Sequence, residues 1–140
     1  MYISAQVTSS YGEHHVSLAT DGTAHAIIIP PKPSGYGSSA NGGELLLLAL
    51  ATCYCNDLYR EASQRAMRLT RVEVEVMGQF GGEGEPATNL TYRVRVVAEA
   101  TEAEIRDLCR QTDRVAEIHN TLRASRPVTL YLVEAVTAQP

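Results

Sequence analysis

The chain has 140 residues, a formal net charge of −4, 44% hydrophobic residues and 20% charged residues. This length predicts a single domain over residues 1–140, large enough to bury a substantial core. The negative charge and the lack of a lysine or arginine cluster argue against a nucleic-acid partner held by phosphate contacts.

The N-terminal part of the sequence predicts a small antiparallel sheet. Residues 1–9 and 14–20 have the composition of strands. Asp21 and Gly22 then supply the two residues of a tight hairpin turn before a third strand at 23–29. We therefore expect strands that follow one another as hairpins.

A long loop is predicted next, over residues 30–43, because this stretch is rich in proline, glycine and serine. Loops of this length in a compact domain often carry function or contact a partner. Its single lysine, Lys32, is the only basic residue before Arg60 apart from histidines.

A long helix is predicted from about residue 43 to residue 67. Asn41 can cap its start, with Glu44 three residues later in the capping-box position. The first three turns, ELLLLALATC, are apolar on every side, and such a helix must be buried on every side. One chain of this size has difficulty covering it, so we expect an obligate homodimer with this helix near the subunit interface.

The rest of the chain predicts two strands, a second helix and a last strand. Residues 70–78 and 91–99 each alternate valine with charged residues, which is typical of a half-buried hairpin. The capping box TEAE predicts a helix that opens at Thr101, and residues 128–136 predict a final strand. The expected fold class is therefore α+β, with antiparallel sheets.

The cysteines and the N-terminus bear on the cellular compartment. Three cysteines are an odd number, which suits reduced thiols better than a disulfide framework. The first residues resemble no signal peptide, and the apolar stretch at 45–55 is too short to cross a bilayer. These features predict a cytoplasmic protein with no membrane partner.

The helix pattern also limits what the cysteines can do. Positions 53 and 55 lie about 200° apart on a helix, so Cys53 and Cys55 cannot form a disulfide with each other or bind the same metal ion. The remaining candidate ligands are scattered, and we expect neither a metal nor another cofactor: His14, His15, His25, His119 and Cys109. Two alternatives remain at this point, namely one working thiol or three small core residues.

The organisation of the chain resembles the OsmC/Ohr family of osmotically induced and organic-hydroperoxide-resistance proteins. The most specific match is GGELLLLALATCYC, which looks like the family's Glu-Leu-Leu run ending in Ala-x-Cys. The order of strands and helices and the HNTLRASRPV ending also follow the family. The resemblance implies an intertwined homodimer, with antiparallel sheets wrapped around long central helices.

By this resemblance Cys53 stands where the family has its peroxidatic cysteine. In catalytic members that thiolate attacks an organic hydroperoxide, a second cysteine closes a disulfide, and an external dithiol reductant reopens it. The resemblance also makes Leu45, Leu46 and Leu50 plausible walls of an apolar pocket.

Three departures from the family pattern affect this chemistry. Ala116 takes the place of the second cysteine, and no arginine precedes Arg60. The glutamate that pairs with the family's arginine would align with Gly43, and Glu44 beside it has the capping position.

Lys32 or His119 could replace the missing cation. In the region of the missing cysteine, His119 could pair with Cys53, although a solvent-facing histidine is the simpler expectation. Asp57 is expected at the surface.

Two functions therefore remain open. One is a divergent one-cysteine, thiol-dependent organic hydroperoxide reductase. The other is a catalytically degenerate family dimer that binds a small hydrophobic ligand at the subunit interface. Both are consistent with an association with oxidative stress.

Overall fold

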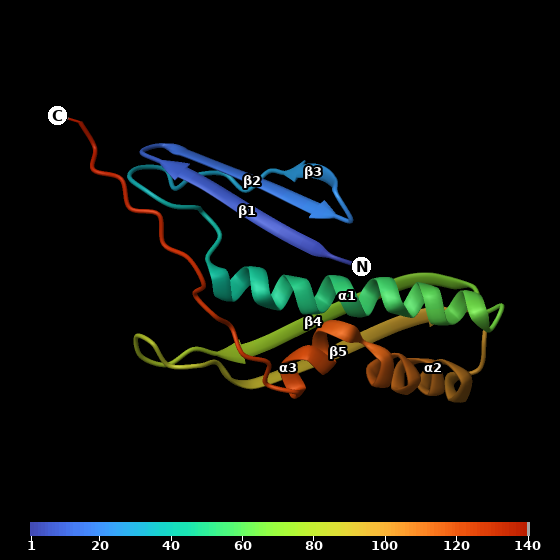
Figure 1. Cartoon of the computed structure of the whole chain (residues 1–140). Coiled ribbons are helices and arrows are strands. Elements are labelled where there is room, and N and C mark those ends of the chain that lie inside the picture. Colours follow the sequence, from blue (N-terminus) through green and yellow to red (C-terminus); the bar gives the residue numbers. More distant parts are fainter. Residues whose placement is uncertain (140) are drawn as a thin grey trace. The chain divides into compact units, whose positions relative to one another are not determined.

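The computed structural model describes residues 1–139 and has an α+β fold (Figure 1). The elements in chain order are β1 (Ile3–Ser10), β2 (Glu13–Thr20), β3 (Thr23–Ile27), α1 (Gly42–Gln64), β4 (Leu69–Gln79), β5 (Thr88–Ala98), α2 (Glu102–Val115) and α3 (Glu117–Arg123). The chain forms two compact units, which share α1, β4 and β5: Met1–Leu48 with Met77–Leu90, and Ala49–Val76 with the chain from Thr91 onward. The fold class predicted from the sequence is confirmed.

The first unit contains a three-stranded antiparallel sheet in the order β1-β2-β3. Between β2 and β3, Asp21 and Gly22 have φ angles of 47° and 83°. Both values lie in the left-handed region that a two-residue hairpin of this kind requires, and glycine and aspartate tolerate it. The hairpin turn predicted at these two residues is confirmed.

The loop after β3 folds back on itself as a small hairpin. Pro31 pairs with Ser38 in an antiparallel bridge, and the Lys32 N–H donates to the carbonyl of Gly37 at 3.1 Å. The tip of this hairpin contacts the β1–β2 turn, where the Gly12 N–H donates to the carbonyl of Gly35 at 3.0 Å. The backbone of this long loop is thus held by hydrogen bonds within the first unit.

Helix α1 begins where the sequence predicts. It ends at Gln64, three residues before the predicted end at residue 67. The Glu44 N–H donates to Asn41 Oδ1 at 2.8 Å, and the Asn41 N–H donates to Glu44 Oε1 at 3.0 Å, which completes the capping box. The helix stops at Gln64 because Ala66 adopts a φ of 52°, and the Met67 N–H then bonds to the carbonyl of Ala62 at 2.9 Å. This is a left-handed helix ending formed without glycine.

The core of the second unit lies where α1 packs against the β4–β5 hairpin and the two shorter helices. Its buried residues are Tyr54, Leu58, Ala62, Leu108 and Ala116, and the inward-facing valines of both strands pack against them. The outer faces of the strands carry opposite charges, as the sequence predicts, with ion pairs between Arg93 and Glu75 and between Arg95 and Glu73. Helix α2 also begins as predicted, with Thr101 as its N-cap.

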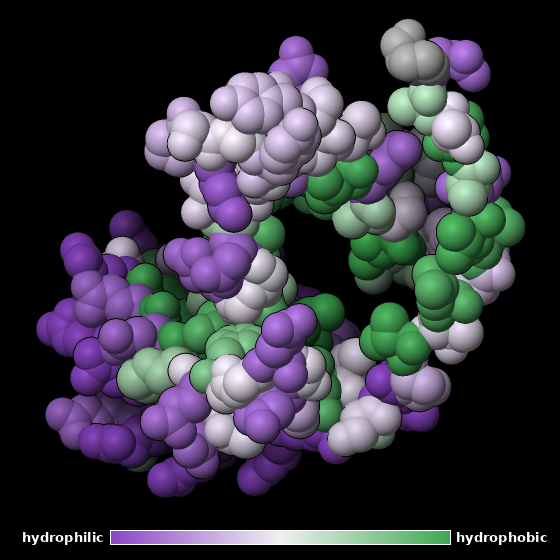
Figure 2. All heavy atoms as spheres, turned by 90° about the vertical axis from the view of Figure 1, so that its left-hand side faces the viewer, coloured by the Kyte–Doolittle hydropathy of each residue, from purple (hydrophilic) through white to green (hydrophobic). Residues whose placement is uncertain are grey.

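The strand predicted at residues 128–136 is absent from this structure. The segment is extended but forms no strand, and its hydrophobic side chains are exposed, with Val128 at 100%. Figure 2 shows them as a run of green spheres down the right of the view. A strand needs a neighbouring strand for its backbone hydrogen bonds, and none in the described chain pairs with this segment.

Among residues 1–139, no helix combines the length and the apolar character needed to cross a bilayer.

Candidate functional site

The candidate site is built on one face of α1 in the second unit. Cys53, Asp57 and Arg60 are spaced by four and three residues, so their side chains share a face of the helix. The Cys53 thiol donates to Asp57 Oδ2 over 3.5 Å. Arg60 Nη1 lies 3.1 Å from Asp57 Oδ1, one turn further on.

Glu117, the first residue of α3, completes this cluster from a distant part of the sequence. Its Oε2 lies 4.0 Å from Cys53 Sγ, and its Oε1 lies 3.2 Å from Arg60 Nη1. A single nitrogen of Arg60 therefore contacts both carboxylates that flank the thiol. Arg60 Nε also lies 3.3 Å from Glu61, which adds a third acidic partner.

The surroundings of Cys53 favour the neutral thiol. Burial raises the pKa of Cys53 above its ordinary value, and the negative charges of Asp57 and Glu117 raise it further. A hydrogen bond from the Ile118 backbone N–H acts in the opposite direction and does not outweigh them. At neutral pH the sulfur is therefore protonated, and the hydrogen bond to Asp57 is a thiol–carboxylate bond.

The two carboxyl groups of the cluster differ in acidity. Burial raises the pKa of Asp57, and hydrogen bonding to Glu117 raises it further, against the opposing effect of Arg60. The pKa of Glu117 is lowered, first by a hydrogen bond from its own backbone N–H and then by its bond to Asp57. Asp57 is thus the group of the pair that holds a proton more readily, and it is the one nearer to the sulfur.

His119 does not join this cluster. Only 6% of it is exposed, and its ring packs against Tyr54 and Tyr92, with centroid distances of 5.9 and 4.8 Å. Neither ring nitrogen has a hydrogen-bond partner within the described chain, so the hydrogen-bonded Cys53–His119 pair suggested by the sequence is not formed. The simpler expectation, a solvent-facing histidine, is also wrong, because the aromatic rings bury the side chain.

The other residues singled out in the sequence fall into two groups. Glu44 serves in the cap of α1, and Lys32 lies in the small loop hairpin, with its side chain near Gly37. Both belong to the first unit, whereas Cys53 belongs to the second, and their roles at the thiol stay predictions. The proposed pocket walls are also helix residues: Leu50 is buried, and Leu45 and Leu46 are partly buried.

Sequence reasoning missed three residues that surround the thiol, namely Asp57, Arg60 and Glu117. Asp57 was expected at the surface, but only 6% of it is exposed, because it lies under Arg60 and beside Cys53. The spacing of Cys53, Asp57 and Arg60 on the predicted helix was a signal that could have found two of the three. No sequence signal places Glu117 there, because that contact depends on how α3 packs.

The cluster also has the donor types of a metal site. One ligand atom each from Cys53, Asp57 and Glu117 lie within 4.8 Å of one another. A cation already pairs with both carboxylates, however, because Arg60 contacts each of them. All three cysteines of the chain are free, so Cys53 is available as a thiol.

Comparison with known proteins identifies the family. The family model described as OsmC-like protein matches residues 35–131, which is most of the chain. The chain belongs to the OsmC-like family. Its Cys53 is within the matched region, and so are Asp57, Arg60 and Glu117. No curated protein sequence matches this chain significantly.

Solved structures share the fold at low sequence identity. An OsmC-like protein from Mycoplasma pneumoniae is 18% identical, with a TM-score of 0.58, and the match covers 86% of this chain and 87% of that one. An OsmC-like hydroperoxide resistance protein from Jannaschia sp. is 11% identical, with a TM-score of 0.53 and coverages of 98% and 93%. An organic hydroperoxide resistance protein from Legionella pneumophila is 17% identical, with a TM-score of 0.51 and coverages of 84% and 89%. The resemblance read from the sequence is confirmed at the level of family and fold.

Proposed function

We propose that this OsmC-like protein is a one-cysteine, thiol-dependent organic hydroperoxide reductase in which Cys53 is the nucleophile. The observation that carries the proposal is the partly buried Cys53 thiol bonded to Asp57, in a chain of a family whose solved members include hydroperoxide resistance proteins. The raised pKa of Cys53 makes this a slow enzyme at neutral pH, since the thiolate is the reactive form.

The first half of the reaction oxidises the sulfur. The Cys53 proton passes to the Asp57 carboxylate, and the thiolate attacks the distal oxygen of the hydroperoxide ROOH. The O–O bond breaks, Cys53 becomes a sulfenic acid, and the alkoxide takes the proton from Asp57 and leaves as ROH. Arg60, which contacts both Asp57 and Glu117, holds the Asp57 carboxylate in place during this transfer.

The second half restores the thiol with an external reductant. With Ala116 in place of the family's second cysteine, one thiol group of a dithiol attacks the sulfenic sulfur, releases water and forms a mixed disulfide. The second thiol group of the reductant then attacks that disulfide. Cys53 is released as a thiol, and the reductant leaves as its own disulfide.

The test is consumption of cumene hydroperoxide by the purified protein with dithiothreitol, at pH 7 and at pH 9. We expect turnover that is faster at pH 9 and disappears in Cys53→Ser. Cys55→Ser is the matched control, because that thiol lies two residues away on the same helix without the acidic cluster. Turnover that persists in Cys53→Ser, or its absence in the wild type at both pH values, contradicts the proposal.

A second candidate function is binding of a small hydrophobic ligand without turnover. The observation that favours it is the acidic surroundings of Cys53, which suppress the thiolate that peroxidase chemistry needs. In that case Cys53→Ala retains the protein's full function. Hydroperoxide consumption separates the two candidates, because only the first predicts a reaction that requires Cys53.

We also propose that the protein works as a homodimer in the cytoplasm. The extended segment after α3 exposes Val128, Leu130, Tyr131 and Val136 to solvent, and a single chain gains nothing from that exposure. A second copy could pair with this segment and bury its side chains. Sedimentation equilibrium should give twice the chain mass at micromolar concentration, and removal of residues 127–140 should shift it to the monomer mass.

A further inference from the structure

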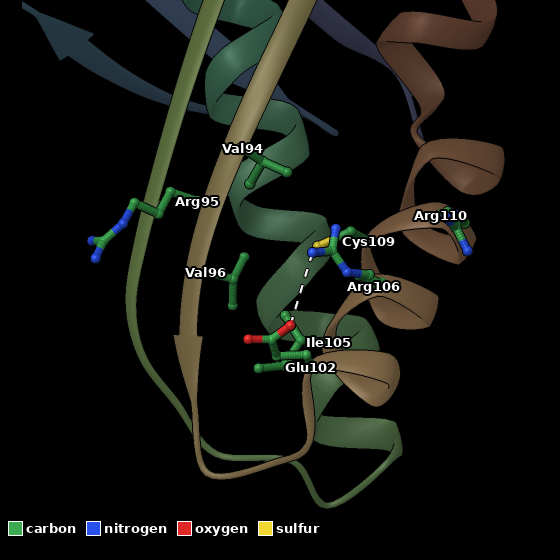
Figure 3. Close-up of a pocket in the computed structure, with 8 residues that line it drawn as sticks. All are labelled: Val94, Arg95, Val96, Glu102, Ile105, Arg106, Cys109 and Arg110. Carbon is green, nitrogen blue, oxygen red and sulfur yellow. Dashed lines mark ion pairs between the residues drawn. The ribbon is translucent and has the colours of Figure 1, made fainter.

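A hollow of the second unit lies between β5 and α2, apart from the cysteine cluster. Its volume is about 550 Å³, which is within the usual range for small-molecule sites. Figure 3 shows the eight residues that line it, from one strand and one helix of the second unit: Val94, Arg95, Val96, Glu102, Ile105, Arg106, Cys109 and Arg110. None of them belongs to the cluster around Cys53.

The inner wall of this hollow is apolar. Val94 and Val96 point from β5 toward the helix, and Ile105 faces them from α2 (Figure 3). All three side chains are only partly buried, so they leave apolar surface in contact with solvent inside the hollow. The Cys109 sulfur lies beside the Arg106 guanidinium (Figure 3), and its uncharged thiol adds to this apolar surface.

The mouth of the hollow carries the guanidinium group of Arg106, which forms only a weak ion pair with Glu102. Arg106 reaches over the hollow beside Cys109, and its Nη2 lies 3.9 Å from Glu102 Oε2 (Figure 3). The side chains of Arg106 and Glu102 are 70% and 91% exposed, and an ion pair so long and so exposed contributes little. Arg110 follows one turn later on α2, but its guanidinium points away from β5 and from Arg106, and Arg95 points to the far side of β5 (Figure 3).

We propose that this hollow binds a small amphipathic carboxylate. The alkyl part packs on Val94, Val96 and Ile105, and the carboxylate displaces Glu102 from Arg106. A guanidinium binds a carboxylate through two parallel hydrogen bonds, and Glu102 offers only one long contact. Arg106 is thus the group at the mouth that binds the anion, because Glu102 holds its guanidinium by one long contact only.

The test uses octanoate as the probe and Cys109 as the reporter. Alkylation of each cysteine by iodoacetamide is followed by mass spectrometry of the peptides, with increasing octanoate. We expect octanoate to slow the alkylation of Cys109, and octylamine, with the same tail and the opposite charge, to have no effect. Arg106→Gln should weaken the protection by about two- to fivefold, because an ion pair to so exposed a guanidinium is weak.

The matched control is Arg114→Gln, which removes an arginine of the same helix that does not line the hollow. In this variant, octanoate should slow the alkylation of Cys109 as much as it does in the wild type. Equal protection in Arg106→Gln, or equal protection by octylamine, would show non-specific association of the alkyl chain and overturn the proposal. Cys53 is measured in the same samples, so a loss of peroxidase activity and a loss of this binding remain separate results.

Discussion

The Cys53 thiol donates a hydrogen bond to Asp57 Oδ2, one turn further along α1, over 3.5 Å. The carboxylate both accepts the thiol proton and, by its charge, opposes formation of the thiolate. The same contact therefore accepts the proton of the thiol and lowers the fraction of Cys53 that is thiolate at neutral pH.

Because the charge of Asp57 opposes formation of the thiolate, we expect Asp57→Asn to make Cys53 more reactive at neutral pH. Loss of the negative charge lowers the pKa of Cys53 toward its ordinary value, so a larger fraction is thiolate at pH 7. We expect iodoacetamide to alkylate Cys53 several-fold faster in the variant. The rate should be followed from pH 6 to pH 10, because in the wild type it rises with pH and reaches its midpoint above that of a free thiol.

Asp107→Asn is the control for this change, since Asp107 is an exposed carboxylate that pairs with Arg65 at 2.8 Å and does not contact Cys53. Its alkylation profile should match the wild type. If Asp57→Asn leaves the profile where it was, the charge of Asp57 has no part in setting the acidity of the thiol.

His119 predicts a loss of stability in mild acid. Burial lowers the pKa of His119 below its ordinary value of 6.5, so the unfolded chain binds a proton more readily than the folded one. The contribution of neutral His119 to stability is therefore fully present above the pKa that His119 has in the unfolded chain. It is lost as the pH falls below that value. His119→Phe keeps an aromatic ring between Tyr54 and Tyr92, and urea unfolding from pH 7.5 to pH 5 should show a smaller decrease.

His25→Gln is the matched control, because it removes an exposed histidine of β3, in the first unit. Asp113 also makes the fold sensitive to acid, but at lower pH. Its pKa is lowered by bonds from Tyr92 and Arg123 in spite of burial, so its contribution is lost only as the carboxylate is protonated below its ordinary range. If the free energy of unfolding of His119→Phe falls between pH 7.5 and pH 5 as steeply as that of the wild type, His119 does not cause the acid sensitivity.

The Tyr92 hydroxyl donates to Asp113, which Arg123 also holds at 2.7 Å. Tyr92→Phe removes the donor and keeps the ring that packs on Tyr54 and His119. We expect the free energy of unfolding to fall by about 1 kcal/mol, the typical value of such a bond when the acceptor keeps another partner. Tyr59→Phe, at an exposed position of α1, should change it far less, and equal effects in urea titrations would contradict this assignment.

Local sequence signals predicted most of the fold. The capping boxes at Asn41 and Thr101, the Asp21-Gly22 turn and the alternation in β4 and β5 each depend on residues that are close in sequence. The segment 128–136 has the same kind of strand pattern but forms no strand, because its pairing depends on a partner strand rather than on its own residues. Propensity alone does not supply that partner.

The site was less predictable than the fold, for a similar reason. The family motif singled out Cys53, but the acidity of its thiol depends on Glu117 and Ile118, which lie more than sixty residues away in sequence. The burial of Asp57 and of His119 depends on how α3 packs against α1 and β5. Such packing contacts have no short-range signature, so the sequence predicts an exposed or a catalytic histidine where the structure has a buried one.

Arg60 predicts an effect opposite in sign to that of Asp57. Its guanidinium neutralises Asp57 and Glu117 together, at 3.1 and 3.2 Å, and Arg60→Gln leaves two carboxyl groups beside the sulfur without their cation. The added negative charge should raise the pKa of Cys53 further, and iodoacetamide should then alkylate it several-fold more slowly at pH 7. Arg65→Gln, on the same helix but paired with Asp107, is the control. Opposite shifts in Asp57→Asn and Arg60→Gln would establish that charge sets the reactivity of Cys53, whereas shifts in the same direction would indicate that both variants only disturb the packing of α3.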